Sequence, residues 1–236
     1  MSAGGEKVCL ITGASRGIGR ATALALNEAG WRLSFVARSK EALVELVRET
    51  DCEHLATVAD ITAEADVTRA VQATVAELGR LDAVVCAAGV GAFGPTTEVT
   101  LESWEAQITA NLTGTFLVCR EALKVMLPQK RGHLVNILSV ASKVAFPYSA
   151  AYVASKWGAY GLTKSLSEEV RREGIRVTAI LPGSVDTPFW DANPNGPPRE
   201  DMLRPDAVAE AVRYALDAPL SASVDEIHLM PPKGIL

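Results

Sequence analysis

The chain has 236 residues, a formal net charge of −5 at pH 7 and an apolar fraction of 48%. This length and composition predict a globular chain, and its scattered basic residues form no block typical of a nucleic-acid-binding surface. No apolar run reaches the roughly 18 residues that a membrane span requires, and no signal-peptide pattern is visible. We therefore expect a cytoplasmic protein with neither nucleic acid nor membrane as a partner.

Short apolar runs alternate with longer helical patterns along the chain. In chain order, the expected strands are residues 8–12, 32–37, 54–59, 81–89, 133–139, 175–183 and 224–230. The expected helices are residues 18–29, 40–48, 63–78, 101–126, about 149–174, and 205–216. Apolar strands that alternate with helices are typical of a parallel sheet covered on both faces. The sequence therefore predicts a Rossmann-like doubly wound α/β fold with about seven mostly parallel strands.

The segment at residues 187–200 is the only region rich in Pro and Gly, and it is too short to link two domains. We therefore expect one domain over residues 1–236. The cysteines and histidines are far apart in the sequence and show no metal-ligand spacing. We expect no metal site, and we expect four reduced thiols: Cys9, Cys52, Cys86 and Cys119.

The first expected strand runs into TGASRGIG, residues 12–19. Glycines between a strand and a helix let the backbone turn tightly and approach a phosphate, and the free N–H groups of the helix can bind that phosphate. The spacing G-x-x-x-G-x-G differs from the usual dinucleotide motif and lacks the Lys-Ser/Thr of a P-loop. We expect a dinucleotide site that uses Gly13, Ser15, Arg16, Gly17, Ile18 and Gly19.

The end of the second expected strand distinguishes between cofactors. An acidic residue there usually binds the ribose hydroxyls of NAD, whereas a basic residue accommodates the 2′-phosphate of NADP. This strand ends in Ala37 and Arg38, and Arg16 could add a second positive charge. We therefore expect NADP(H) to be preferred over NAD(H). The alternative is that both arginines are ordinary solvated surface charges.

The segment at residues 149–165 contains two Tyr-x-x-x-Lys pairs, Tyr152 with Lys156 and Tyr160 with Lys164. If this helix begins near residue 149, Tyr152 lies in its first turn, close to Ser139 at a carboxyl strand end. Tyr160 lies roughly 12 Å further along the helix axis. Ser139, Tyr152 and Lys156 can therefore converge, whereas we expect Tyr160 to be a packed or surface residue.

The first pair also suits general acid–base chemistry. Free tyrosine has a pKa near 10, too high for a base at neutral pH. An ammonium group about 5 Å away would lower the pKa of Tyr152 by about 2 units at an effective dielectric of ~20, and an oxidised nicotinamide ring would add positive charge. Tyr152 could then protonate a developing alkoxide, while Ser139 donates a hydrogen bond to the same oxygen.

Over nearly its whole length the chain resembles the short-chain dehydrogenase/reductase family. The resemblance rests on TGASRGIG, Asp60, Asn111 in ANLTGTF, Ser139, YVASK at residues 152–156 and PGSVDT at residues 182–187. It implies a catalytic tetrad of Asn111, Ser139, Tyr152 and Lys156, in which Asn111 holds a water of a proton relay. It also implies that Lys156 binds the nicotinamide ribose. The further cofactor contacts that it implies are Asp60, Ile61, Ala88, Gly89, Tyr152, Pro182, Gly183, Val185 and Thr187.

Two departures from the family pattern are visible. The usual Asn-Asn-Ala-Gly after the fourth strand is replaced by Cys86-Ala87-Ala88-Gly89, which removes hydrogen bonds that stabilise the sheet. The C-terminal segment also lacks the Val-Asp-Gly-Gly ending of the acyl-carrier-protein reductases, which argues weakly against a fatty-acid role.

The resemblance implies an NADP-dependent oxidoreductase acting on a small or medium carbonyl or alcohol. Phe189 and Trp190 predict a mostly apolar, partly open substrate pocket. Family members pair subunits through the matching Ala- and Leu-rich helices, so a homotetramer or homodimer is expected. Two alternatives are a non-catalytic NADP(H)-binding sensor or scaffold, and another Rossmann-type enzyme such as a methyltransferase. Neither has a use for both Tyr152 and Lys156.

Overall fold

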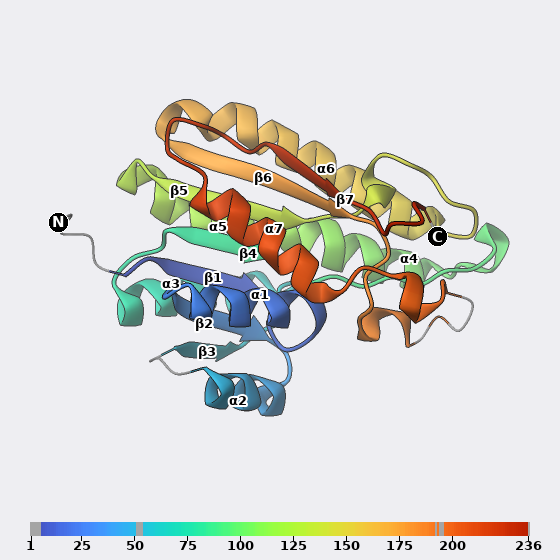
Figure 1. Cartoon of the computed structure of the whole chain (residues 1–236), viewed down its shortest axis with the longest axis horizontal. Helices are drawn as coiled ribbons and strands as arrows, with labels where there is room; N and C mark the ends of the chain where they lie inside the picture. Colours follow the sequence, from blue (N-terminus) through green and yellow to red (C-terminus); the bar gives the residue numbers. More distant parts are fainter. Residues whose placement is uncertain (1–5, 51–53, 192, 194–195, 236) are drawn as a thin grey trace.

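The computed structural model describes residues 6–50, 54–191, 193 and 196–235. Seven strands form one sheet in the order β3-β2-β1-β4-β5-β6-β7, and every neighbouring pair is parallel (Figure 1). The strands are β1 (Val8–Thr12), β2 (Arg32–Ala37), β3 (Leu55–Val58), β4 (Ala83–Cys86), β5 (Gly132–Ile137), β6 (Ile175–Pro182) and β7 (Glu226–Leu229). Successive strands are added on one side of β1 up to β3 and on its other side from β4 onward. Ligands bind in such folds at this switch point between β1 and β4. The predicted α/β fold is confirmed.

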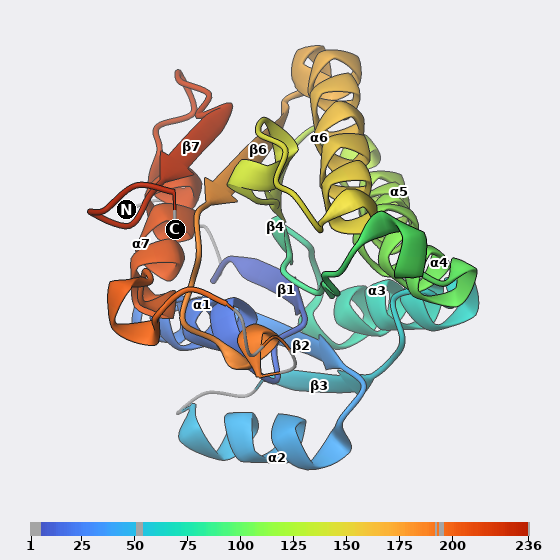
Figure 2. The same ribbon diagram turned by 90° about the vertical axis from the view of Figure 1, so that its right-hand side faces the viewer.

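Helices cover both faces of the sheet (Figure 2). One apolar core lies between the sheet and α1, α2 and α7, and a second lies between the sheet and α3, α5 and α6. The helices are α1 (Gly17–Glu28), α2 (Lys40–Glu49), α3 (Glu64–Leu78), α4 (Leu101–Ile108), α5 (Gly114–Gln129), α6 (Ala150–Val170) and α7 (Pro205–Asp217). The central strands are buried on both faces, which explains why they read as continuous apolar runs.

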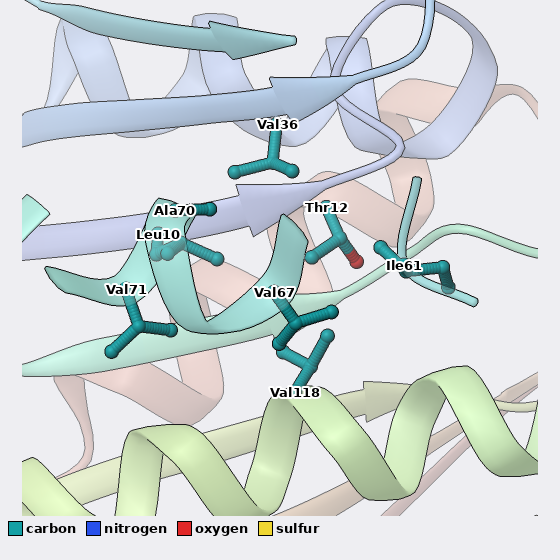
Figure 3. Close-up of a pocket in the computed structure, with 8 residues that line it drawn as sticks. All are labelled: Leu10, Thr12, Val36, Ile61, Val67, Ala70, Val71 and Val118. Carbon is teal, nitrogen blue, oxygen red and sulfur yellow. The ribbon is translucent and has the colours of Figure 1, made fainter. Parts of the chain in front are cut away.

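The second core contains a small gap beneath β1 and β2 (Figure 3). Its volume is about 10 Å³, and Thr12 is the one polar residue among the eight that line it. The other lining residues are Leu10, Val36, Ile61, Val67, Ala70, Val71 and Val118. A gap this small and apolar is a packing defect of the interior and not a ligand site.

The expected single helix at residues 101–126 is wrong in one important respect. A π-helical turn, Thr109–Thr113, separates α4 from α5, and α5 continues to Gln129. The extra residue in a π-turn shifts the helical faces before and after it relative to each other. It places Asn111 against the segment that follows β4, so a hydrogen bond to that segment accompanies the irregular turn.

In the described part of the chain, no helix combines the length and apolarity needed to cross a membrane. The same part holds no group of three metal-ligating side chains. Cys9, Cys86 and Cys119 are buried free thiols, and burial raises the pKa of Cys9. Cys52 lies outside the described residues.

Candidate active site

The glycine-rich loop packs closely against the segments that follow β4 and β6, and against itself. Gly13 and Gly17 have φ angles of 67° and 55°, which side-chain-bearing residues rarely adopt. A Cβ on Gly13 would lie 2.8 Å from the Ala88 backbone, and one on Gly17 would lie 3.2 Å from Thr187. A Cβ on Gly19 would lie 2.3 Å from the Gly13 carbonyl oxygen. Gly19 is therefore needed for the loop to fold against its own helix.

An open groove of about 390 Å³ lies at the ends of β2 and β3, next to α4. Arg38, Asp60 and Val90 line it together with Thr62, Glu102, Glu105, Ala106, Thr109 and Ala110. Asp60 accepts hydrogen bonds from the Thr62 backbone N–H at 2.9 Å and from the Thr62 hydroxyl at 2.8 Å. These bonds fix the turn after β3. The lining includes Arg38 and Asp60, two of the expected cofactor contacts.

The two candidate phosphate-binding arginines are exposed. Arg16 occupies the N-cap position of α1 without a capping hydrogen bond from its side chain, and Arg38 directly follows β2. Within the described residues, neither arginine has an acidic partner in an ion pair. Their charges thus remain available to a phosphate. Ser15 lies in the glycine loop, whereas Ile18 and Ile61 pack against the two cores.

The segment after β6 is held in place by backbone pairing. Gly183 N–H donates to the Leu229 carbonyl at 2.8 Å, and Val185 forms a parallel bridge with Leu203. Pro182 ends β6, and Thr187 packs against Gly17. Val185, one of the expected cofactor contacts, is buried in the first core. Its side chain is part of that core, so only its backbone could contact a cofactor.

Asn111 uses its side chain to hold the loop that follows β4. Its Oδ1 accepts from Val90 N–H at 2.8 Å, while its Nδ2 donates to the Val90 carbonyl at 2.8 Å and to Ser155 Oγ at 2.9 Å. Both amide hydrogens are therefore engaged. A water could be bound only through an acceptor of Asn111: the backbone carbonyl, which already accepts from the Thr115 hydroxyl at 2.8 Å, or Oδ1, each of which has a second lone pair.

Lys156 is buried directly beneath this loop. Its Nζ donates to the Ile137 carbonyl at 3.2 Å and lies 5.8 Å from the centre of the Tyr152 ring. A Cβ on Gly89 would lie 3.0 Å from Asn111 Oδ1 and 3.7 Å from Lys156 Nζ. Gly89 thus leaves space above the ammonium group. Burial lowers the pKa of Lys156 to about 8, so the amine is still largely protonated at pH 7.

Tyr152 and Ser139 lie together at the carboxyl ends of β5 and β6. Tyr152 is in the first turn of α6, as expected, and Ser139 caps a short 3₁₀ turn, Val140–Ser142, through a 3.1 Å bond from Ala141 N–H. Burial raises the pKa of Tyr152 to about 12, opposed by the neighbouring Ser139 hydroxyl. Desolvation of the phenol thus opposes the lowering expected from Lys156 together with an oxidised nicotinamide ring.

The second Tyr-x-x-x-Lys pair binds a different partner. Tyr160 donates to Glu226 Oε1 at 2.5 Å, and Lys164 Nζ lies 3.3 Å from the same oxygen. Lys143, just after the turn that Ser139 caps, pairs with the other carboxylate oxygen and lies 4.9 Å from the centre of the Tyr160 ring. Tyr160 is packed away from Tyr152, and it attaches α6 to the edge strand β7.

Two aromatic side chains contact Tyr152, and a third, Trp190, packs against both of them. Phe93 follows β4, and Phe189 and Trp190 lie in a 3₁₀ turn after β6, Pro188–Trp190. The Tyr152 ring centre is 5.5 Å from that of Phe93 and 5.7 Å from that of Phe189. Sequence reasoning missed Phe93, although its position shortly after a carboxyl strand end was a usable signal. It also missed Gly91, where a Cβ would lie 2.3 Å from Phe189.

Comparison with known proteins agrees with this geometry. The family model described as short chain dehydrogenase matches residues 7–197. The chain belongs to the short-chain dehydrogenase family. An uncharacterized oxidoreductase of Staphylococcus epidermidis is 33% identical over 96% of this chain and 97% of its own length. A Staphylococcus aureus oxidoreductase is 34% identical over 96% of this chain and 97% of its own length.

Solved structures of this family are similar throughout. An alcohol dehydrogenase from the archaeon Thermococcus sibiricus, complexed with 5-hydroxy-NADP, has a TM-score of 0.87 and 33% identity, covering 96% of this chain and 97% of that one. An actinorhodin polyketide ketoreductase variant with NADPH has a TM-score of 0.89 and 31% identity, covering 98% of both chains. This short-chain dehydrogenase is therefore an oxidoreductase with the Rossmann-like fold of its nicotinamide-cofactor-binding neighbours.

Proposed function

We propose that this oxidoreductase transfers a hydride between NADP(H) and a small or medium carbonyl or alcohol, with Tyr152 as the general acid and base. The observation that carries the proposal is the meeting of Ser139, Tyr152 and Lys156 beside Gly89, at the edge of the sheet where the glycine loop also lies. A non-catalytic sensor could use the glycine loop but would need no buried acid–base group.

Each side chain of the proposed catalytic site has a distinct role in the reaction at the substrate oxygen. The bound nicotinamide supplies or accepts the hydride. In reduction, Tyr152 donates its proton to the developing alkoxide while Ser139 donates a hydrogen bond to the same oxygen. Lys156 places a positive charge near the phenolate that forms, which opposes the effect of burial on the pKa of Tyr152. Asn111 positions the loop above Lys156 through its bonds to Val90.

The proposed preference for NADP(H) rests on Arg16 and Arg38. Both are exposed at the glycine loop and β2 end, and the structure pairs neither with an acid among the described residues. Guanidinium groups bind phosphate through charge-assisted hydrogen bonds. The neighbours described above were solved with 5-hydroxy-NADP and with NADPH, which supports the same choice.

We also propose a homodimer or homotetramer. Leu101, Trp104, Phe116 and Trp157, which lie on α4, α5 and α6, are exposed large apolar side chains. Such a concentration of apolar surface is typical of an interaction site. Light scattering should give at least twice the mass of the 25.0 kDa chain; a monomer would contradict this assignment.

The experiment measures oxidation of NADPH and of NADH with a panel of aldehydes, ketones and keto acids, using wild type and Ser139→Ala. We expect turnover with NADPH above that with NADH, and a kcat loss of about 10²–10³-fold in Ser139→Ala, because one donor to the developing oxyanion is removed. Binding of NADPH without turnover of any panel member would favour the sensor function. Equal rates in both proteins would refute the role of Ser139.

A further inference from the structure

We propose that the space in front of Tyr152 is a binding site for a planar, uncharged ring of the substrate, and that the Phe189 ring occupies it until the substrate displaces it. This inference rests on the proposed function and names its substrate class as aryl ketones and the corresponding alcohols. The evidence is the arrangement of four aromatic rings from three separate segments.

The walls of this ring site are Phe93 and Trp190, whose rings stack against each other and do not face each other across a gap. Their planes are within 12° of parallel, with centres 5.8 Å apart. Phe189 meets both walls edge-on, at 71° and 6.0 Å from Phe93 and at 81° and 5.3 Å from Trp190. Its centre is also 5.7 Å from that of Tyr152. Edge-to-face contacts of this kind are favourable for any aromatic ring, whether it belongs to the protein or to a ligand.

The opposite side of the Phe189 ring is bounded by bare backbone. A Cβ on Gly91 would lie 2.3 Å from Phe189 Cζ and 3.2 Å from Tyr152 Cδ2. The absence of a side chain at Gly91 thus makes room for the Phe189 ring next to the Tyr152 ring. A substrate carbonyl hydrogen-bonded to Tyr152 must place its substituents next to that ring, and Phe189 fills part of this volume.

The Phe189 ring lacks the hydrogen bond that fixes the Trp190 ring. Trp190 donates from Nε1 to the Val185 carbonyl at 3.1 Å, which fixes the wall to the segment after β6. The phenyl ring of Phe189 has only apolar contacts, and it sits in a 3₁₀ turn of three residues. A rotation of one side chain can therefore clear the space while Phe93 and Trp190 stay in place.

The charge distribution argues against an anionic substrate. The aromatic walls carry no ionisable group. Arg199, the basic residue in the segment at residues 187–200, is exposed. It already donates to Asp186 and Asp191, each at 2.7 Å. A carboxylate or phosphate attached to the substrate ring would face these aromatic side chains, which would compensate its desolvation poorly.

The test compares three ketones with NADPH: acetophenone, cyclohexyl methyl ketone of similar size without a planar ring, and benzoylformate, which carries a carboxylate in place of the methyl group. Wild type should favour acetophenone over the cyclohexyl compound in kcat/KM by about three- to tenfold, the range expected for one lost aromatic contact. It should also favour acetophenone over benzoylformate. Equal kcat/KM for acetophenone and the cyclohexyl compound, or a preference for benzoylformate, would overturn the proposal.

Two variants distinguish a displaceable ring from a fixed wall. Phe93→Ala removes a wall and should raise KM for acetophenone about three- to tenfold. Phe189→Ala removes the ring that must move and should lower that KM. A rise in KM in both variants would show that Phe189 is a wall and would overturn the proposal. Tyr214→Ala, at an exposed aromatic on α7, is the matched control and should leave KM unchanged.

A binding measurement separates this inference from the proposed function. Acetophenone is titrated into Tyr152→Phe with NADP⁺ bound, and quenching of Trp190 fluorescence is taken as the difference from the same protein carrying Trp190→Phe. Quenching that weakens in Phe93→Ala supports the ring site even if no ketone is turned over, in which case only the proposed function fails. Absence of Trp190 quenching, with normal NADP⁺ binding, would overturn the ring site alone.

Discussion

Neutralising Glu226 should weaken the fold in a pH-dependent way. The carboxylate is partly buried at the β7 edge, where Lys143, Tyr160 and Lys164 surround it. Burial alone would raise the pKa of Glu226, but its hydrogen bonds to these three side chains outweigh burial and lower the pKa from 4.5 to about 2. One unit corresponds to about 1.36 kcal/mol, so the full shift corresponds to about 3 kcal/mol. After discounting for solvent screening, we expect Glu226→Gln to cost ~1–3 kcal/mol at pH 7.

The sign of the pH dependence follows from the lowered pKa. The contribution of Glu226 is fully present above pH 4.5 and is lost as the pH falls from about 4.5 to about 2. Urea unfolding of wild type and Glu226→Gln at one protein concentration should therefore give a constant difference from pH 7 to about pH 5 and a shrinking difference below it. Glu210→Gln, which breaks an exposed pair with Arg213, is the control and should cost well under ~1 kcal/mol. A variant as stable as wild type at pH 7, or a difference independent of pH, would refute this reasoning.

Three further substitutions test the site. Lys156→Met should abolish turnover and raise the melting temperature below pH 8. Burial lowers the pKa of Lys156 to about 8, so its buried charge costs stability until the proton is lost. An unchanged or lower melting temperature would contradict this. Arg38→Asp should raise KM for NADPH by about 10- to 100-fold and leave KM for NADH nearly unchanged, since a charged hydrogen bond to the 2′-phosphate is lost; parallel changes for both cofactors would count against a phosphate role. Gly89→Ala should fold but lose about 10- to 100-fold in kcat, because its Cβ would lie 3.0 Å from Asn111 Oδ1 and disturb Lys156. A kcat equal to that of wild type would show that the loop after β4 can shift to accept the methyl group, and would contradict this prediction.

Local patterns were enough to predict the sheet and the placement of the Tyr152 pair. Apolar runs mark the buried strands, and a helix beginning near residue 149 puts Tyr152 in the first turn of α6 and Tyr160 beyond the site. Both follow from periodicity and rise per residue, which depend on neighbours along the chain.

Features that depend on distant contacts could not be predicted in this way. The π-turn at Asn111 contains no proline or glycine, and it accompanies bonds to Val90, 21 residues earlier. The bond of Tyr160 to Glu226 joins residues 66 positions apart. The burial that raises the pKa of Tyr152 also depends on distant contacts, because Phe93 and Phe189 pack against its ring.

The central claim is that Tyr152, and not Tyr160, exchanges the proton with substrate. The most direct test is kcat of NADPH-dependent ketone reduction in Tyr152→Phe and Tyr160→Phe, both verified as folded by circular dichroism. The account predicts loss of turnover in Tyr152→Phe and, in Tyr160→Phe, activity close to wild type with lower stability, since the bond to Glu226 is removed. Full activity in Tyr152→Phe, or an inactive but folded Tyr160→Phe, would contradict it.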